Sequence, residues 1–379
     1  MVNKQIEKYL MKNILFITTI YRQGERIYPI LPQLSNHYKI DLLQINEMSN
    51  DMDNYGNIDN RNLFHKEYDS CFNNIIDGTI KSIESKGARN DNPSDVIKNL
   101  DVDKYDMIIY DDDRNRHGIN SIYNRVKNKI PLIGNVHGNF WYPDSGKSNI
   151  KNCYDKVFNK AFVLGEKEKK AHYPNDYILS GGIPSNDELK YYDRTDDFIL
   201  IIVNFLGNMK GQIPNHYSVL FDEYFMKNSG LIELQQKYNK NVVFKLKSRA
   251  AGPMLQQDID YLNSIVPREL NYDVIVDFED NNQLICGAFL VLAAPSLLTL
   301  KSIQKGIPTI VIDGAGLTGN FYDYRGLIEL KQSKVLSEAE NQLKLGRDID
   351  FIKNTIEGGV NFNSTEKYIE KIIGVFDET

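Results

Sequence analysis

The chain has 379 residues, of which 41% are hydrophobic and 25% charged, and its formal net charge is −6. These proportions are typical of a globular protein, and the negative charge argues against a basic surface that binds nucleic acid or anionic lipid. Three widely spaced cysteines, Cys71, Cys153 and Cys286, argue against a disulfide framework or a cysteine-based zinc site. The length predicts two domains.

The opening stretch MVNKQIEKYL is polar and lacks the apolar core of a signal peptide. No run of about 18 apolar residues, the length needed to span a membrane, occurs in the sequence. We therefore expect a cytoplasmic protein without a transmembrane segment, and peripheral contact with a membrane is left open.

The first half opens with a β-α-β pattern. NILFITTI (13–20) predicts a strand, IYPILPQLSNHY (27–38) a helix and KIDLLQI (39–45) a second strand, whereas residues 64–100 predict mainly helix. Four more strands are predicted, namely YDMIIYDD (105–112), IPLIGNVHG (130–138), KAFVLGE (160–166) and DYILSGG (176–182). Continuous apolar strands are typical of a parallel sheet covered on both faces, so we interpret residues 11–184 as one doubly wound α/β domain.

A second cycle follows SGGIPSNDELKYYDRTDD (180–197), a composition typical of a linker. Its predicted strands are FILIIVNFL (198–206), NVVFKLK (241–247), YDVIVDF (272–278), FLVLAA (289–294) and PTIVID (308–313), with helices between them and a helical, amphipathic tail over 348–376. The predicted fold class is α/β, with two doubly wound, Rossmann-like parallel-sheet domains that face a cleft. The first covers residues 11–184, the second 185–365, and a C-terminal helix at 366–379 returns to the first.

This pattern resembles the GT-B fold of nucleotide-sugar glycosyltransferases, in the group that also holds glycerophosphotransferases and nucleotide-sugar 2-epimerases. Three stretches carry the resemblance: IPLIGNVHG (130–138), YILSGGIPSND (177–187) and FLVLAAPSLLTLKSIQKGIPTIVID (289–313). The Glu-x7-Glu signature of retaining enzymes is not recognisable. The resemblance implies an inverting, metal-independent transferase that moves a sugar from a nucleotide-sugar donor to a hydroxyl of a glycan or another acceptor.

The donor is expected on the second domain. Pro295, Ser296, Leu297 and Thr299 lie where a predicted strand ends and a helix begins, and free N–H groups there bind anions. The alternative is that Ser296 is only a helix N-cap. The other donor-binding candidates lie at or just after the ends of neighbouring predicted strands and are Gly207, Asn208, Lys245, Lys247, Arg249, Asp313, Gly314, Gly316, Gly319 and Asn320.

Two of these groups have competing interpretations. The basic residues at the end of NVVFKLKSR suit a diphosphate, but they could also form a solvated edge. GAGLTG (314–319) formally matches the dinucleotide fingerprint G-x-G-x-x-G, yet little chain remains to build the β-α-β unit that this motif requires. A loop near the donor sugar, or a structural turn, is the preferred interpretation.

The acceptor side and the catalytic base are expected on the first domain. The candidates for catalysis are His137, Asp112 and Glu25, because an inverting transferase needs a base that deprotonates the acceptor hydroxyl. The acceptor-side candidates are Arg22, Gln23, Gly24, Asp111, Asp113, His117 and Gly138. A structural, hydrogen-bonded role is the alternative for His137.

Asp111–Asp113 also resemble the metal-binding Asp-x-Asp of GT-A glycosyltransferases, in which paired carboxylates hold Mg²⁺ or Mn²⁺. That alternative leaves the second α/β unit unexplained, so no cofactor and no essential metal are expected. Two further alternatives stay open at this stage: a nucleotide-sugar 2-epimerase on the same fold, and a non-catalytic protein that binds a nucleotide sugar.

Overall fold

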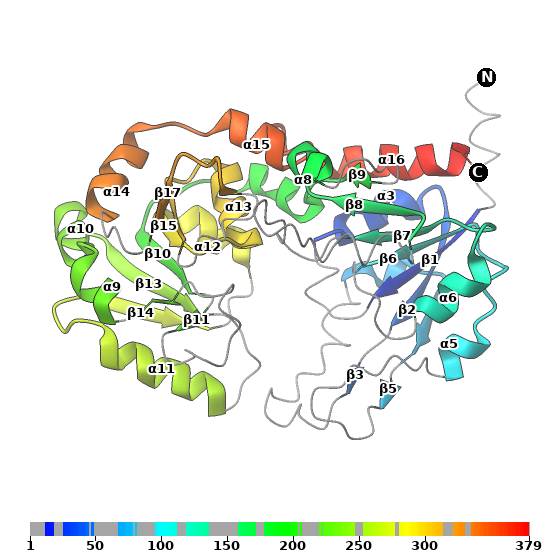
Figure 1. Ribbon diagram of the computed structural model, residues 1–379, viewed down its shortest axis with the longest axis horizontal. Coiled ribbons are helices and arrows are strands. Elements are labelled where there is room, and N and C mark those ends of the chain that lie inside the picture. The colour runs from blue at the N-terminus through cyan, green and yellow to red at the C-terminus, as the bar shows by residue number, and fades with distance from the viewer. Residues whose placement is uncertain are drawn as a thin grey trace.

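The computed structural model describes residues 12–18, 26–44, 47–48, 67–78, 80–81, 95–111, 119–135, 158–171, 178–203, 205–206, 220–221, 223–246, 253–276, 280–313, 321–329 and 335–378. Within these ranges the chain forms two large parallel sheets, each in its own lobe (Figure 1). No strand pairing among the described residues joins one large sheet to the other. The predicted fold class, two doubly wound parallel-sheet units, is confirmed.

The first sheet has seven strands in the order β4-β2-β1-β6-β7-β8-β9. They are β1 (Asn13–Thr18), β2 (Lys39–Gln44), β4 (Asn74–Asp77), β6 (Met107–Tyr110), β7 (Leu132–Asn135), β8 (Lys160–Val163) and β9 (Ile178–Ser180). The helices of this half are η1 (Tyr28–Ile30), α3 (Leu31–Ser35), η3 (Asp69–Cys71), α5 (Asp95–Asn99), α6 (Ile119–Val126) and α8 (Glu166–Ala171), and β3 (Glu47–Met48) pairs apart with β5 (Ile80–Lys81). Every pairing in the sheet is parallel, and the strand order reverses between β1 and β6.

The second sheet has six strands in the order β14-β13-β10-β15-β16-β17, again all parallel. They are β10 (Phe198–Val203), β13 (Asn241–Leu246), β14 (Tyr272–Ile275), β15 (Ala288–Ala293), β16 (Thr309–Asp313) and β17 (Leu327–Glu329). Its helices are α9 (Glu223–Asn228), α10 (Leu231–Tyr238), α11 (Pro253–Ile265), α12 (Asn281–Gly287), α13 (Leu297–Lys305) and α14 (Val335–Lys344), and β11 (Phe205–Leu206) pairs apart with β12 (Leu220–Phe221). Here the order reverses between β10 and β15.

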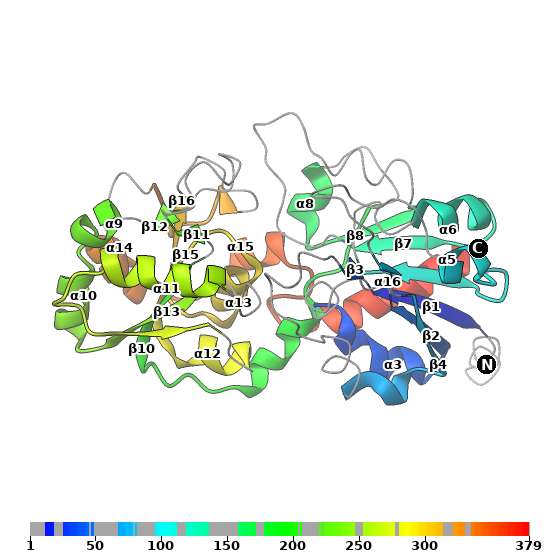
Figure 2. The same cartoon turned by 90° about the horizontal axis from the view of Figure 1, so that it is seen from below.

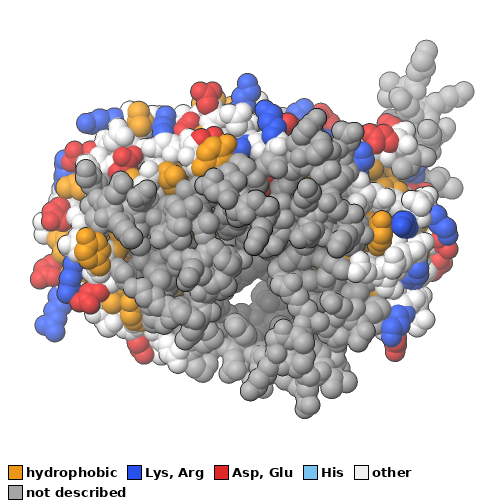
Figure 3. All heavy atoms as spheres, viewed as in Figure 1, with side chains coloured by type: hydrophobic (Ala, Val, Ile, Leu, Met, Phe, Trp, Pro, Cys, Tyr) orange, Lys and Arg blue, Asp and Glu red, His pale blue; other side chains and the backbone are white. Residues whose placement is uncertain are grey.

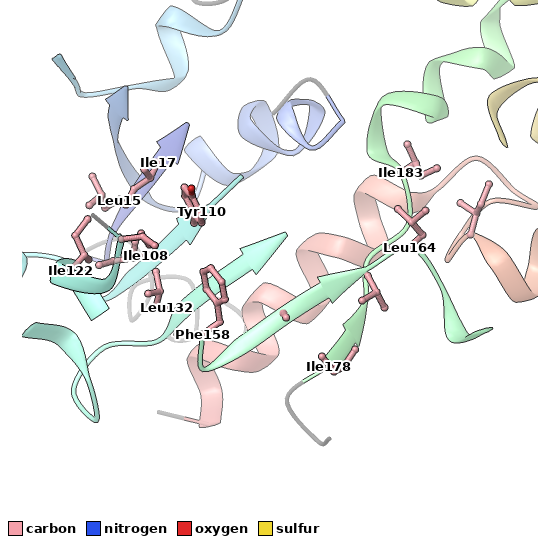
Figure 4. Close-up of a cluster of buried hydrophobic side chains, with 14 of the residues drawn as sticks. Leu15, Ile17, Ile108, Tyr110, Ile122, Leu132, Phe158, Leu164, Ile178 and Ile183 are labelled. Carbon is pink, nitrogen blue, oxygen red and sulfur yellow. The ribbon is translucent and has the colours of Figure 1, made fainter. Parts of the chain in front are cut away.

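Burial on both faces explains why the central strands are continuous apolar runs. In β1 and β10 every residue after the first is buried. Leu15 and Ile17 of β1 pack on one face with Tyr110 and Phe158 (Figure 4). The same cluster extends to Ile303, Phe351 and other residues of the second half, so the two lobes share a hydrophobic core where they meet.

The chain crosses twice between the lobes. The 3₁₀ helix η4 (Pro184–Tyr191) leads from the first sheet to the second, and α15 (Ile349–Thr355) and α16 (Ser364–Glu378) lead back. In Figures 1 and 2, α16 lies over the first sheet and away from the second sheet. Tyr368 of α16 stacks on Phe162 of β8 with ring centroids 4.0 Å apart. The last helix is therefore part of the core of the first half.

Three local expectations need correction. The stretch 64–100 was expected to be mainly helical, but within its described residues it contains the edge strand β4 as well as the short helices η3 and α5. The expected linker contains the helix η4, whose Pro184 and Leu189 are buried. β17, which follows the glycine-rich stretch without an intervening helix in the described residues, was not predicted. The domain boundaries themselves stay a prediction.

The described surface carries both signs of charge. In Figure 3, lysine, arginine, aspartate and glutamate side chains are interspersed over the coloured parts of both lobes. None of the helices in the described ranges combines the length and the apolar character needed to cross a membrane.

Candidate functional site

The strand order of each sheet locates a candidate site. In an open parallel sheet, ligands bind beyond the carboxyl ends of the strands, where the strand order reverses. In the first sheet this point lies beyond Thr18 and Tyr110, the last residues of β1 and β6, and Asp111 follows directly. In the second sheet it lies beyond Val203 and Ala293, the ends of β10 and β15. In the chain, the predicted acceptor-side and donor-side candidates lie at or after the ends of these strands and of their neighbours β7, β13 and β16.

Asp111 is held inside the first sheet. Its side chain is fully buried, and Oδ2 accepts a hydrogen bond from the Thr18 hydroxyl at 2.7 Å. The Thr18 oxygen is also 2.7 Å from the hydroxyl of Tyr28, which must donate because the Thr18 proton is already used. Asp111 therefore ties the end of β6 to the end of β1 and to η1.

A second series of hydrogen bonds holds the end of β7, the strand beside β6. Asn135, the last residue of β7, donates from Nδ2 to the carbonyl oxygen of Tyr110 at 2.9 Å. Its Oδ1 accepts a hydrogen bond from the Tyr368 hydroxyl of α16. Burial raises the pKa of Tyr368, although its hydrogen bond to Asn135 and the nearby charge of Arg26 oppose that rise. The neutral hydroxyl thus fixes the strand end from which residues 136–138 continue.

Arg26 is a residue at this edge that the sequence interpretation did not select. It directly follows the site candidates Arg22, Gln23, Gly24 and Glu25 in the chain and is only 5% exposed. Its carbonyl oxygen accepts a hydrogen bond from the Ser185 N–H at 3.0 Å, which anchors it to the interlobe connection. The signal available in the sequence was a basic residue at the start of an apolar helical stretch, beside a glycine-containing loop.

At the second sheet, the start of α13 is a capped helix N-terminus. Ser296 Oγ accepts the Thr299 N–H at 3.2 Å. The Thr299 hydroxyl donates to the Ala294 carbonyl oxygen at 2.6 Å, so Ser296 is the donor in its 2.8 Å bond to Thr299 Oγ1. Thr299 is fully buried. In this structure Ser296 acts as an N-cap, and the Thr299 hydroxyl points inward to the backbone.

The cap leaves other backbone N–H groups available at the N-terminus of α13. The backbone N–H groups of Leu297 and Leu298 have no acceptor among the described residues, and both residues are partly exposed, as are Pro295 and Ser296. Unpaired N–H groups and the helix dipole together favour an anion at this position. The N-cap and anion-site interpretations of Ser296 are therefore compatible.

Lys245 lies at the end of β13, on the same sheet edge. Its ammonium group donates to the carbonyl oxygens of Val276 at 2.8 Å and Leu246 at 3.3 Å, so it bridges the ends of β13 and β14. Asp313 ends β16, where it pairs with Glu329 of β17.

The other predicted site residues lie outside the described residues. They are Arg22, Gln23, Gly24, Glu25, Asp112, Asp113, His117, His137, Gly138, Gly207, Asn208, Lys247, Arg249, Gly314, Gly316, Gly319 and Asn320. Their assignment to the site stays a prediction.

Polar contacts also join the two halves of the molecule. Asn186 of η4 donates to the Gln304 side chain of α13 at 2.7 Å, and both residues are buried. Lys167 of α8 forms an ion pair with Asp323, which precedes β17. Burial lowers the pKa of Lys167, and its hydrogen bond with Asp323 opposes that effect. The contacts link the connection after β9 and the helix after β8 to the second sheet.

The GT-A alternative is contradicted by the fold, because the second doubly wound sheet is fully formed and the two sheets together are of the GT-B type. Within the described ranges, no group of three His, Cys, Asp or Glu side chains is placed to hold a metal ion.

Solved structures share this architecture over nearly the whole chain. UDP-GlcNAc 2-epimerase from Methanocaldococcus jannaschii superposes with a TM-score of 0.62 at 14% identity, covering 95% of this chain and 99% of that one. The Neisseria meningitidis UDP-GlcNAc 2-epimerase bound to UDP-GlcNAc gives 0.59 at 11%, covering 96% and 100%. Anabaena HepE, solved with UDP and glucose, gives 0.53 at 10%, covering 97% and 99%. By sequence, the chain matches no protein-family model and no curated protein.

Proposed function

We propose that the protein is a nucleotide-sugar enzyme that epimerises a UDP-linked N-acetylhexosamine at C2. The observation that carries this proposal is the similarity in fold to two UDP-GlcNAc 2-epimerases across at least 95% of this chain. This ranks the epimerase above the glycosyltransferase that the sequence pattern favoured, because several of the similar structures carry the epimerase name, and two of those that carry it were solved with UDP-GlcNAc.

The second sheet would hold the nucleotide. The N–H groups of Leu297 and Leu298, for which the described residues supply no acceptor, offer donors to the diphosphate, and the Ser296 hydroxyl can add another by turning away from Thr299. These donors are fixed by the fold, so they need no reorganisation when the ligand arrives. Lys245 lies on the same edge, where its positive charge favours the diphosphate.

The first sheet would supply the acid and base. Inversion at C2 requires that the C2 proton leaves from one face of the sugar and that a proton returns on the other face, so two groups must exchange protons. Because C2 has no adjacent carbonyl, the electron pair of the broken C2–H bond forms a C1=C2 double bond while the C1–oxygen bond to UDP breaks. UDP then returns to C1 when C2 is protonated on the other face. Glu25, Asp112 and His137 are the candidates, because they follow β1, β6 and β7 in the chain. No acceptor is needed, and the substrate and product are isomers.

Glycosyl transfer is the second candidate function. The observation in its favour is the similarity to Anabaena HepE, which was solved with UDP and glucose. A transferase breaks the bond between the sugar and the diphosphate and forms a new bond to an acceptor hydroxyl, whereas C2 keeps its hydrogen throughout.

Deuterium incorporation separates these functions. The protein is incubated with UDP-GlcNAc in deuterated water, and the recovered sugars and nucleotides are followed by proton NMR. Epimerisation by proton exchange gives a second UDP-sugar and deuterium at C2 of both isomers. Release of UDP with C2 still protonated, dependent on an added glycan acceptor, would favour the transferase. An unchanged substrate that still raises the melting temperature would favour a binding protein.

A further inference from the structure

The two terminal nitrogens of the Arg26 guanidinium are buried and have no hydrogen-bond partner in the described part of the chain. The residue is 5% exposed, and no acceptor among the described residues reaches Nη1 or Nη2, both of which are buried. No carboxylate of the described ranges forms an ion pair with it either. A buried charge without compensation is strongly unfavourable, so its retention calls for an anion that is bound in the functional state.

The described polar groups that the structure relates to Arg26 are engaged elsewhere. The Tyr368 hydroxyl, which senses the Arg26 charge, donates its proton to Asn135. Asp187, two residues beyond the Ser185 that binds the Arg26 carbonyl, accepts the backbone N–H groups of Ser364 at 3.0 Å and Thr365 at 2.7 Å. Each polar group therefore already has its own partner.

The half-buried arginines among the described residues are satisfied. Arg125 donates to the carbonyl oxygens of Ile97 at 2.6 Å, Leu100 at 2.7 Å and Lys98 at 3.1 Å. Arg347 likewise donates to three backbone carbonyls. The unpaired state of Arg26 is thus a local property of the carboxyl edge of the first sheet.

We propose that Arg26 binds an oxyanion at the carboxyl edge of the first sheet, beside the connection between the lobes. The guanidinium is a planar fork that matches the paired oxygens of a phosphate or carboxylate group. The diphosphate of a nucleotide sugar is one source, which rests on the proposed function. A separate anion, bound apart from the nucleotide, is the other. In both cases the chemistry at Arg26 is the same.

The test compares Arg26→Met with Arg125→Met as a matched control, since each removes one guanidinium from the first half. Melting temperatures are measured for both variants and the wild type with inorganic phosphate, UDP and uridine, and chloride maintains constant ionic strength. Removing an uncompensated buried charge in favour of an apolar side chain of similar volume is neutral or stabilising. Arg26→Met should therefore melt at or above the wild-type temperature without phosphate, whereas Arg125→Met should melt lower.

The anion responses then decide the proposal. Phosphate should raise the melting temperature of the wild type and of Arg125→Met, and Arg26→Met should bind phosphate about tenfold to a hundredfold more weakly. If the source is the nucleotide, Arg26→Met also loses most of the UDP shift, and phosphate competes with UDP. If the anion is separate, the phosphate and UDP shifts add, and only the phosphate shift is lost.

Two results would overturn the proposal: an unchanged phosphate response in Arg26→Met, or no phosphate response in the wild type. Arg26→Lys, which keeps the charge but loses the fork, should retain part of the response and guards against a folding defect in the methionine variant. Because the assay needs no turnover, a failure of the proposed epimerase activity leaves this outcome unaffected.

Discussion

Two adjacent glycines after β9 allow the chain to pass between the lobes. A Cβ on Gly181 would lie 2.6 Å from the Phe162 ring and 2.8 Å from Tyr368. Gly182 has φ +74°, and a Cβ there would lie 2.2 Å from the carbonyl oxygen of Glu357. The close approach of the β9 end to the start of α16 therefore requires residues without side chains.

The first prediction concerns this position. Gly182→Ala should destabilise the protein by about 2–5 kcal/mol, because a positive φ and backbone overlap both oppose a side chain. Gly374→Ala is the matched control: Gly374 is an exposed residue of α16 with no atom within 4 Å of the added Cβ. That change should stabilise by about 0.5–1 kcal/mol. Urea unfolding measures both, and equal effects would contradict the argument.

For single residues, the sequence is enough to predict the place of a residue within a helix or strand, but it does not predict which groups the side chain contacts. The order of residues is enough to place Ser296 at a helix start, since a strand, a serine and an apolar helix follow one another. The commitment of the Thr299 hydroxyl to Ala294 depends on the turn between them. The surroundings of Arg26 include Tyr368, whose pKa the Arg26 charge lowers and which lies more than three hundred residues later, so no local pattern could indicate them.

At the scale of elements, the edge strand β4 is held by polar contacts. Asp41 of β2 accepts hydrogen bonds from Asn74 of β4 at 2.8 Å, Tyr105 at 2.9 Å and Lys104 at 3.1 Å. Burial alone would raise the pKa of the Asp41 carboxyl, but these hydrogen bonds and the Lys104 charge hold it below the ordinary 3.8. The ionised carboxylate therefore contributes to the stability of the folded sheet.

The second prediction is a pH dependence. The pKa of Asp41 is lower in the folded state than in the unfolded state. Its contribution to the free energy of unfolding is therefore fully present above the pKa of the unfolded state, and it is lost as the pH falls through the pKa of the folded state. Asp41→Asn should therefore unfold more easily than the wild type at pH 6, and the difference should shrink below pH 4. Asp103→Asn, which removes an exposed ion pair with Lys129, is the control and should have little effect at either pH. A constant difference across this range would contradict the assignment.

The strands that the sequence predicted and those it missed differ in burial. β1 and β10 are buried along almost their whole length, so each is an unbroken apolar run. In β4, by contrast, Ile75 is 47% exposed and the strand has only four residues. Such a short edge strand has no distinct period, and its pairing with β2 is set by tertiary contacts. β17, with three residues, was missed for the same reason.

At the scale of the whole molecule, each lobe presents the carboxyl edge of a sheet at which strand order reverses. The edges differ in chemistry. The second offers backbone N–H groups and Lys245, which suit a diphosphate, whereas the first is built from buried hydroxyl, amide and carboxyl groups around Asp111 and Asn135. The GT-B arrangement could be predicted because the sequence repeats the same strand and helix cycle twice. We infer a division of labour between the lobes.

The final prediction tests that division. Ser296→Ala should weaken UDP binding about tenfold to a hundredfold, because it removes a donor to a charged group, and should cost about 1 kcal/mol of stability as a lost cap. Asp348→Ala removes the N-cap of α15, where Asp348 accepts the Phe351 N–H at 3.2 Å, and should lower stability without changing UDP affinity. His137→Ala should lower kcat while UDP affinity stays within a few-fold, since a base acts mainly in the transition state. Calorimetric titration with UDP, together with turnover of the UDP-sugar, measures all three. Loss of UDP binding in His137→Ala, with normal binding in Ser296→Ala, would mean that the lobes have the opposite roles.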